Sequence, residues 1–582
     1  MALLLLLGVA LAATILMDGV VAFQASHDFG RARVANVHQS RFRSNIELQS
    51  SLSVDRVSDD KAATTTSKEE ESKGIRPLHQ NWWPVVTVDS LKEDRPNQIR
   101  VLGKPLVTYF NQKDEEWKVL DDMCSHRFAP LSEGRVLNGN LQCAYHGWCF
   151  DSSGTCTRVP QQPDRVDKAK PVQSYAVKKD LGILWVWMDP ETLDSIGNKI
   201  RLPIDPLLRK CYEGSGDTYC FMRDLPYGME ILGENLLDLS HLPYAHHSVG
   251  NLKRSLGNEL PTRMLSLKER EEFATWEQGY DASADPVLPK MQAEIMQAAA
   301  HDPIFAGFYD ANNPDQFANW TTKIGFFEPF HARYTRFGFS TSTVELFMCP
   351  LSEGKSRVFL FNCFDMMVTK PKTLKDKIFK ILLNTRLGGS KGHMIAHKIF
   401  DGDGIFLHKQ GNRMKVASKS FKDYSTPASA DVLLNSYRRY LDVAAEKTRQ
   451  AGLNSVAATV VGMNKYGDDA PRAELLDRYN THTVHCSICM KDLQNARKRN
   501  VNLQRLETAL QGTTGSGIAA LLTFAAIRRL SSMAIPGTAL GATALASTVG
   551  LAGSFLTARL RRSTDKTING FLFEDYVHAD KN

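Results

Sequence analysis

Cysteine is scarce in this chain. Ten cysteines occur among 582 residues, which is too few for the disulfide framework of a small secreted protein. Four of them stand in two motifs described below, and the others are scattered. This usage indicates a protein of a reducing compartment, whose cysteines bind metal or act as free thiols.

The sequence also lacks the signs of two common ligand classes. No basic run is interleaved with aromatic residues and the formal net charge is only +7, so we expect no nucleic-acid partner and at most a docking face for an acidic electron donor. The G-x-G-x-x-A match at 515–520 lies in an apolar run with no preceding strand, which excludes a dinucleotide site there. Electrons must therefore come from a separate protein.

Residues 124–148 hold four metal-ligand side chains in an unusual spacing. Cys124 and His126 form a C-x-H pair, and Cys143 and His146 form a C-x-x-H pair after sixteen intervening residues. Zinc also takes two cysteines and two histidines, but zinc fingers usually draw each like pair from one hairpin or helix. Here each loop supplies one residue of each type. A [2Fe–2S] centre with both thiolates on one iron and both imidazoles on the other needs this arrangement.

This segment resembles the Rieske domain, and in particular its oxygenase branch. Rieske proteins of the cytochrome bc type carry one further cysteine in each loop, where this chain has Arg127–Phe128 and Ala144–Tyr145. Gly147 allows a tight turn against the cluster, and the neighbouring Trp148 would shield it. Imidazole ligation raises the reduction potential to roughly −150 to +300 mV, so the resemblance implies a cluster that ferredoxin reduces.

A second metal motif lies in residues 234–247, ENLLDLSHLPYAHH. Asp238 and His241 are three apart and would share a helix face, whereas His246 lies about 140° further round a regular helix. Pro243 stands between the histidines and is expected to kink the helix, which would let both imidazoles converge. Two imidazoles and one carboxylate from elsewhere make the facial triad of non-haem Fe(II) oxygenases.

The D-x-x-H-x-x-x-x-H pattern of this stretch resembles the iron motif of Rieske non-haem iron oxygenases. His247 is the alternative to the second histidine of the pattern. The resemblance implies an aspartate more than a hundred residues later as the third ligand, and Asp403, which precedes an apolar helical turn, fits better than Asp401. His393 and His397, at i, i+4 spacing, are a possible metal pair on their own.

The same resemblance implies a path for electrons. In this family a carboxylate hydrogen-bonds the iron-ligand histidine and reaches a cluster histidine across a subunit interface, so the enzyme is a ring of three. Carried over to this chain, that role falls on Asp238, between His241 and His146, and the protein is expected to be a homotrimer. Three protein ligands would leave room on Fe(II) for dioxygen and for a substrate beside it.

Cys486 and Cys489 form a C-x-x-C motif further along the chain. With His482 and His485 they could make half a zinc site, but no second C-x-x-C exists to complete it. We therefore favour a redox dithiol that thioredoxin oxidises and reduces. Two free thiols near a helix end are the alternative.

Two long apolar stretches follow. Ala509–Ile527 holds nineteen uncharged residues and Leu530–Ala558 holds twenty-nine, with two arginines between them. At about 1.5 Å per residue, these lengths match a bilayer core of about 30 Å, so we predict a transmembrane hairpin. Gly537-x-x-x-Gly541 would supply a small-residue face for helix packing.

The N-terminal residues have the composition of targeting sequences. Residues 1–22 have the apolar run and small-residue end of a signal peptide. Residues 23–77 begin rich in Arg and Ser and poor in acids, as in a transit peptide, and end in a polar stretch expected to be a disordered linker. This order resembles the bipartite presequences of algae with secondary plastids and implies a plastid protein. An ordinary secreted protein is the alternative.

Short apolar segments separated by turns begin near residue 78 and predict an α+β fold. We expect a small antiparallel β Rieske domain and then an iron domain, in which helices near 286–300 and 371–400 flank an antiparallel sheet. The predicted parts are a Rieske [2Fe–2S] domain at 78–200, a mononuclear iron domain at 201–445, a helical C-x-x-C segment at 446–507, the transmembrane hairpin at 508–558 and a tail at 559–582.

This order of parts resembles the pheophorbide a oxygenase group of plastid, membrane-anchored Rieske oxygenases. The NWWPV segment at 81–85 and the terminal DYVHA sequence are features that soluble bacterial oxygenases lack. The resemblance implies a ferredoxin-dependent enzyme, with its catalytic domains in the stroma, that uses dioxygen on a chlorophyll-derived tetrapyrrole. Oxygenation of pheophorbide a with ring opening is favoured. The alternatives are a chlorophyllide or protochlorophyllide oxygenase-like enzyme and a redox-sensing Rieske component of a plastid membrane protein-import assembly.

Overall fold

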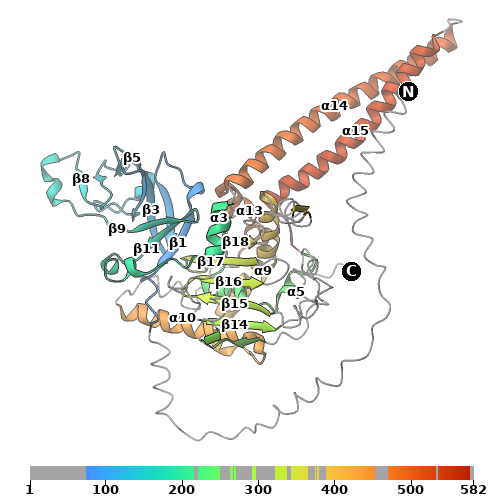
Figure 1. Cartoon of the computed structure of the whole chain (residues 1–582). Coiled ribbons are helices and arrows are strands. Elements are labelled where there is room, and N and C mark those ends of the chain that lie inside the picture. The colour runs from blue at the N-terminus through green and yellow to red at the C-terminus, as the bar shows by residue number, and fades with distance from the viewer. Residues whose placement is uncertain are drawn as a thin grey trace, which may run out of the picture. The chain divides into compact units, whose positions relative to one another are not determined.

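The computed structural model describes most of the chain after the predicted presequence (Figure 1). The predicted signal peptide and residues 23–73 of the predicted transit peptide and linker lie outside the described residues. The described ranges, apart from isolated positions between them, are 74–214, 220–249, 262–266, 291–296, 321–336, 342–364, 389–451, 469–531 and 535–576.

The segment predicted as the Rieske domain forms three small antiparallel sheets. Their strand orders are β1-β11-β10, β2-β3-β4-β9 and β5-β6-β7-β8. Short alternating apolar segments joined by Gly- and Asn-containing turns give this architecture. The strands are β1 (Trp82–Thr87), β2 (Asn97–Val101), β3 (Lys104–Asn111), β4 (Glu116–Asp121), β5 (Arg135–Leu137), β6 (Asn140–Gln142), β7 (Cys149–Phe150), β8 (Cys156–Arg158), β9 (Ser174–Tyr175), β10 (Val177–Asp180) and β11 (Ile183–Trp187).

The second part is built on one antiparallel sheet of seven strands, in the order β12-β18-β17-β16-β15-β14-β13. Figure 1 shows β14 to β18 as neighbouring arrows. The strands are β12 (Phe221–Leu225), β13 (Thr262–Met264), β14 (Met291–Met296), β15 (Thr321–Phe327), β16 (His331–Arg336), β17 (Ser342–Ser352) and β18 (Lys355–Phe364). The α-helices described in this part are α3 (Pro206–Gly214) before the sheet, α4 (Met229–Leu236) and α5 (Leu242–Ala245) between β12 and β13, and α9 (Ser390–Val416) and α10 (Val432–Gln450) after it.

The two parts share a hydrophobic core. Trp185 of β11 packs its ring 5.7 Å from Phe330 and 5.5 Å from Phe347 of β17, measured between ring centroids. Trp83 of β1 lies 5.5 Å from Phe330 as well. Four of the large aromatic residues that the sequence places in NWWPV and ILWVW are thus buried, and burial of such rings contributes strongly to stability. The loops at 124–148 have a separate small core.

One predicted element has a different structure. The stretch near 286–300 was expected to be helical, but residues 291–296 form β14, which pairs with β13 and β15. Met, Gln, Ala and Glu in this segment favour a helix, and pairing between two neighbouring strands overrides that local preference. Of the other predicted helical stretch, the described part is the start of α9 at Ser390.

The C-terminal part contains two short helices, α12 (Arg472–Leu475) and α13 (Arg478–Thr481), and two long ones, α14 (Ser487–Leu530) and α15 (Gly537–Leu572). The long helices lie side by side as a hairpin (Figure 1). Both are long and apolar enough to cross a membrane. The predicted boundary at 508 falls inside α14, so one helix continues from the C-x-x-C motif into the apolar stretch.

The glycines that pack the hairpin are not the predicted pair. A Cβ atom added at Gly537 or Gly541 would meet nothing within 4 Å. One added at Gly517 would lie 2.0 Å from Ser547 Oγ, and one added at Gly550 would lie 2.5 Å from Thr514 Oγ1. The predicted G-x-x-x-G motif lies at the first turn of α15, away from this contact. The predicted α+β class is confirmed: an antiparallel β domain, a helix-flanked sheet domain and two apolar C-terminal helices are present.

Candidate metal centres

The two loops that carry the first motif have the same backbone conformation. Cys124 N–H donates to the carbonyl five residues later, at 2.9 Å, and Cys143 N–H does the same, also at 2.9 Å. Each cysteine carbonyl accepts from the N–H four residues later, from Phe128 at 2.8 Å and from Gly147 at 3.0 Å. The two donors of these bonds, Phe128 and Gly147, both have positive φ, 61° and 75°. Two equivalent loops therefore present one cysteine and one histidine each.

The side chains of these loops converge. The cysteines are buried, each 2% exposed, and the rings of His126 and His146 lie 4.6 Å apart. Trp148 stacks on His126 with centroids 4.5 Å apart and planes at 2°. Burial raises the pKa of the Cys124 thiol to about 11, so a thiolate in this place needs a bound cation. The donor set fits a [2Fe–2S] cluster.

The two histidines of the second motif flank a short helix, α5, that follows α4 in the chain. His241 is the N-cap of α5 and His246 is its C-cap, while α4 ends before Asp238. Pro243 therefore lies in the first turn of a new short helix, where its missing N–H costs nothing, and does not kink a continuous helix as predicted. The single turn of α5 brings the two imidazoles to the same side, with ring centroids 5.3 Å apart.

Asp403 of α9 completes this group. One of its carboxylate oxygens, Oδ1, lies 3.6 Å from His241 Nε2 and 3.2 Å from His246 Nε2. The three ligand atoms all lie within 4.8 Å of one another. Burial raises the pKa of Asp403, but the charges of His246 and His241 together with the polar contacts of His246 and Asn235 have the larger combined effect and lower it. Two imidazoles and one ionised carboxylate can hold a divalent metal on one face.

The surroundings of the triad support a metal ion. His246 is fully buried, its Nε2 lies 3.2 Å from Asp403 Oδ1, and the described residues offer no well-aligned hydrogen bond to either ring nitrogen, an expensive arrangement unless another group binds there. His247, the alternative ligand, faces elsewhere, and its Nδ1 accepts from Arg254 N–H at 3.2 Å. Asn235 Nδ2 lies 3.2 Å from His241 Nε2. The residues present fit a mononuclear iron.

Comparisons with known proteins agree with both centres. Residues 81–176 match the Rieske [2Fe-2S] domain family. Pheophorbide a oxygenase of Oryza sativa subsp. japonica is 28% identical over 537 residues, 86% of this chain and 84% of the relative. Flavonoid 8-hydroxylase 2 of Ocimum basilicum is 28% identical over 446 residues, 74% and 76% of the two chains. Protochlorophyllide-dependent translocon component 52 of Arabidopsis thaliana is 26% identical over 514 residues, 78% and 82%.

The chain is a Rieske oxygenase of the pheophorbide a oxygenase group. It carries a Rieske [2Fe–2S] cluster and a mononuclear non-haem iron, as predicted. Reduced ferredoxin, dioxygen and an organic substrate are the partners of such an enzyme. The chloroplastic relatives and the two apolar helices show that the oxygenase is a plastid membrane protein.

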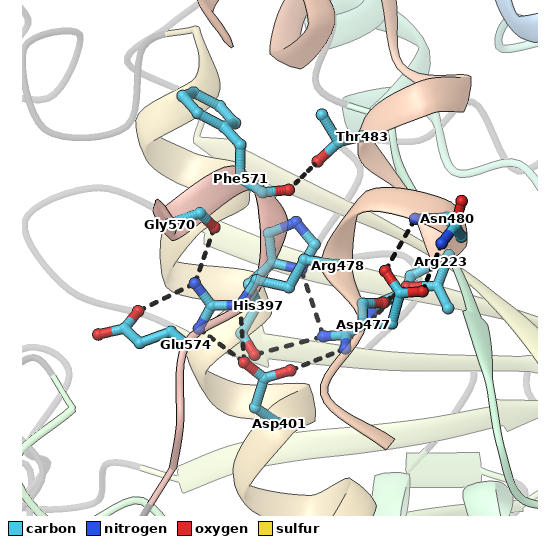
Figure 2. Close-up of polar contacts among 11 residues, drawn as sticks. Arg223, His397, Asp401, Asp477, Arg478, Asn480, Thr483, Gly570, Phe571 and Glu574 are labelled. Atoms are coloured by element: carbon cyan, nitrogen blue, oxygen red, sulfur yellow. Dashed lines mark hydrogen bonds and ion pairs between the residues drawn. The ribbon is translucent and has the colours of Figure 1, made fainter. Parts of the chain in front are cut away.

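Asp401, the alternative third ligand, has another role in the oxygenase. It is fully buried between two buried arginines, 2.7 Å from Arg223 Nη2 and 2.6 Å from Arg478 Nη2 (Figure 2). Arg478 also donates to Gly570 O at 2.9 Å and pairs with Glu574 at 2.9 Å. The aspartate two residues before the triad carboxylate therefore joins β12, α13 and the end of α15.

The C-terminal tail reaches the triad. Tyr576 donates its hydroxyl to Ala245 O at 2.8 Å, and His578 Nε2 lies 2.8 Å from Gly402 O. A Cβ atom added at Gly402 would meet the Tyr576 ring at 3.0 Å and His246 Nδ1 at 3.1 Å. Sequence reasoning assigned no function to these two residues. The DYVHA sequence was the available signal.

The two cysteines of the C-x-x-C motif belong to a group of four potential metal ligands that differs from the predicted one. Cys486 and Cys489 come together with His482, but the fourth member is His393 of α9, and all four are buried with their ligand atoms within 4.8 Å of one another. His485 is exposed. His397, the predicted partner of His393, instead lies with Nδ1 at 3.2 Å from Arg223 Nη1. Sequence reasoning missed this group because it searched for a second C-x-x-C.

Proposed function

We propose that this oxygenase acts on a chlorophyll-derived tetrapyrrole and that pheophorbide a, with oxygenation and ring opening, is its substrate. The match to this chain covers 84% and 73% of the length of two relatives named pheophorbide a oxygenase. A third relative, the translocon component, has protochlorophyllide in its name. The observation that carries the proposal is the complete triad of His241, His246 and Asp403. A chain that had lost catalysis would have no reason to keep this buried polar group.

The protein's own residues have defined roles in this proposal. Cys124, His126, Cys143 and His146 hold the [2Fe–2S] cluster, and the triad holds the iron. When bound, the two centres supply electrons one at a time and a site at which dioxygen reacts. Asp238 Oδ2 lies 3.3 Å from His241 Nδ1 and orients that ring. Tyr576 and His578 cover the triad on the side of Gly402 and restrict the entry of water.

The finer features of the proposal follow from the family resemblance. The enzyme is a homotrimer in which Asp238 of one subunit reaches His146 of its neighbour. The catalytic parts face the stroma, where ferredoxin is found, and the targeting sequence is bipartite, as in a secondary plastid.

The substrate is tested with purified full-length protein in detergent, reduced ferredoxin and dioxygen. Pheophorbide a, chlorophyllide a, protochlorophyllide and a flavone are supplied separately, the last because one relative is named as a flavonoid hydroxylase. We expect consumption of pheophorbide a, followed by product mass. His241→Ala is the inactive control. Turnover of the flavone alone, or of none of the four, would refute the proposal.

A redox-sensing component of a protein-import assembly is the second candidate, favoured by the relative named as a translocon component. Iron content separates the two. A sensor without catalytic iron holds two irons per chain, both in the cluster, whereas the oxygenase holds three, of which one is lost in His241→Ala.

A further inference from the structure

We infer that His393, His482, Cys486 and Cys489 form a structural zinc site that is separate from both iron centres. The four side chains are each at most 8% exposed. They come from two places in the chain that are about ninety residues apart, the first turn of α9 and the segment that leads into α14. Tetrahedral coordination by two thiolates and two imidazoles is a usual arrangement for structural zinc.

The distances between the ligand atoms match a tetrahedron. His393 Nδ1 lies 3.2 Å from His482 Nε2, 3.2 Å from Cys489 Sγ and 3.5 Å from Cys486 Sγ, and His482 Nε2 lies 3.3 Å from Cys489 Sγ. With Zn–N near 2.1 Å and Zn–S near 2.3 Å, tetrahedral geometry places the ligand atoms about 3.3 to 3.8 Å apart. The observed separations of 3.2 to 3.5 Å lie at or just below the lower end of this range.

Hydrogen bonds among the four side chains do not explain why their ligand atoms converge. A ring nitrogen carries at most one proton and directs it along one line in the ring plane, yet three partners surround His393 Nδ1. His482 donates its own proton elsewhere, because its Nδ1 lies 2.6 Å from Met222 O. That bond leaves a lone pair on Nε2, which faces the other three ligand atoms. A backbone carbonyl that fixes the tautomer in this way is a usual partner of a zinc-bound histidine.

The charge balance also favours a divalent cation. Two thiolates and two neutral imidazoles carry two negative charges, which one Zn²⁺ neutralises. The group lies among apolar side chains, with Phe221 stacked 4.5 Å from the His482 ring and Leu493 and Phe571 packed nearby. A neutral metal complex can be buried there, whereas uncompensated thiolates cannot.

The site would fix the membrane hairpin to the catalytic part. Zinc would join the start of α14 to α9, and α9 also carries Asp403 ten residues beyond His393. The Ser390 hydroxyl donates to Asp492 of α14 at 2.6 Å beside it. Binding energy at structural zinc sites is folding energy, so the zinc would hold this junction rather than take part in the reaction.

This inference and the redox dithiol predicted from the C-x-x-C spacing make opposite predictions. The test is metal analysis of the full-length protein. It is purified without chelators, and its affinity tag is removed before the final steps, so that purification neither removes nor introduces metal. We expect one zinc and three irons per chain. X-ray absorption at the zinc edge, which does not detect iron, should show two sulfur neighbours near 2.3 Å and two nitrogen neighbours near 2.1 Å.

Two histidine variants provide the matched comparison. His482→Ala should lose the zinc, and His485→Ala, three residues away and exposed, should keep it. If His482→Ala does not accumulate, the wild type still decides: modification of its thiols by an organomercurial should release one zinc per chain. Three irons without zinc, four irons without zinc, or a Cys486–Cys489 disulfide that thioredoxin reduces in the native protein would each overturn the inference.

Discussion

Asp238 Oδ2 lies 3.3 Å from His241 Nδ1, on the side of the imidazole opposite to the ring nitrogen that faces Asp403. Burial raises the pKa of Asp238, but the hydrogen bond and charge of His241 together with Ser240 have the larger combined effect and lower it. The carboxylate is thus ionised and fixes one tautomer of the histidine. We predict that this pair couples the iron site to an electron donor.

Asp238→Asn should leave both metal centres loaded and slow turnover by about 10- to 100-fold or more, because an amide lacks the charge that orients the histidine. The measurement is single-turnover oxidation of the reduced cluster, followed by its absorbance, beside an iron count. Cluster oxidation at the wild-type rate would contradict the assignment.

Asp403→Asn and Asp401→Asn should fail in different ways, although the residues are two apart. The first removes the carboxylate that faces both histidines, so we expect a folded protein with two irons per chain. The second leaves two buried arginines without their shared partner and should cost about 3 to 5 kcal/mol of stability. Iron content and thermal unfolding of both variants check this. Iron loss in Asp401→Asn at unchanged stability would reverse the assignment.

Gly402→Ala and Gly404→Ala test the cover over the triad. A methyl group at 402 would press on Tyr576 and on the His246 ring, whereas at 404 the nearest contact is an ordinary 3.7 Å to Tyr227. Both changes should favour the helix by up to about 1 kcal/mol. We expect several-fold lower turnover and faster proteolysis of the tail in the first variant only. Equal behaviour of the two would show that the tail does not act at the triad.

Glu345 should make stability fall as the pH rises. Burial raises its pKa to about 8, and its Oε2 lies 2.6 Å from His331 Nε2. The folded state keeps a proton that the unfolded state has lost above its ordinary pKa of 4.5, so the free energy of unfolding declines until the pH passes about 8.

Between about pH 7 and 8 this one group, which is half deprotonated at the upper limit, lowers the free energy of unfolding by about 1 kcal/mol. The lowered pKa of His331 contributes little in this window, because an unfolded histidine with its ordinary pKa of 6.5 is then mostly neutral. Denaturant unfolding of the wild type and Glu345→Gln across this window measures the difference. The variant should have the flatter profile, and parallel profiles would show that Glu345 is ionised in the folded protein.

The sequence was sufficient for the parts of the sites that are local. The loops around Cys124 and Cys143 and the pattern from Asp238 to His246 hold their ligands within a few residues, so residue type and spacing already carry the chemistry. The choice between neighbouring candidate ligands, at two positions, required the three-dimensional structure. His246 and Asp403 each have a neighbour of suitable chemistry, and burial and direction separate them from His247 and Asp401.

Long-range contacts explain what the sequence did not predict. His393 reaches the C-x-x-C motif only because α9 packs beside the start of α14, and no spacing rule connects residues about ninety positions apart. The strand at 291–296 likewise depends on pairing with β13 and β15. The helix-packing motif was misplaced because glycine spacing alone does not show which face of α15 meets α14.

The docking of Tyr576 and His578 against Ala245 and Gly402 also sets an order of assembly. Both tail residues follow the hairpin of α14 and α15 in the chain. A nascent chain that holds every triad ligand therefore still lacks this cover until both hairpin helices and the segment after them have been synthesised. The closed iron site thus depends on hairpin folding, and a chain that stopped before Tyr576 would leave its iron open to solvent.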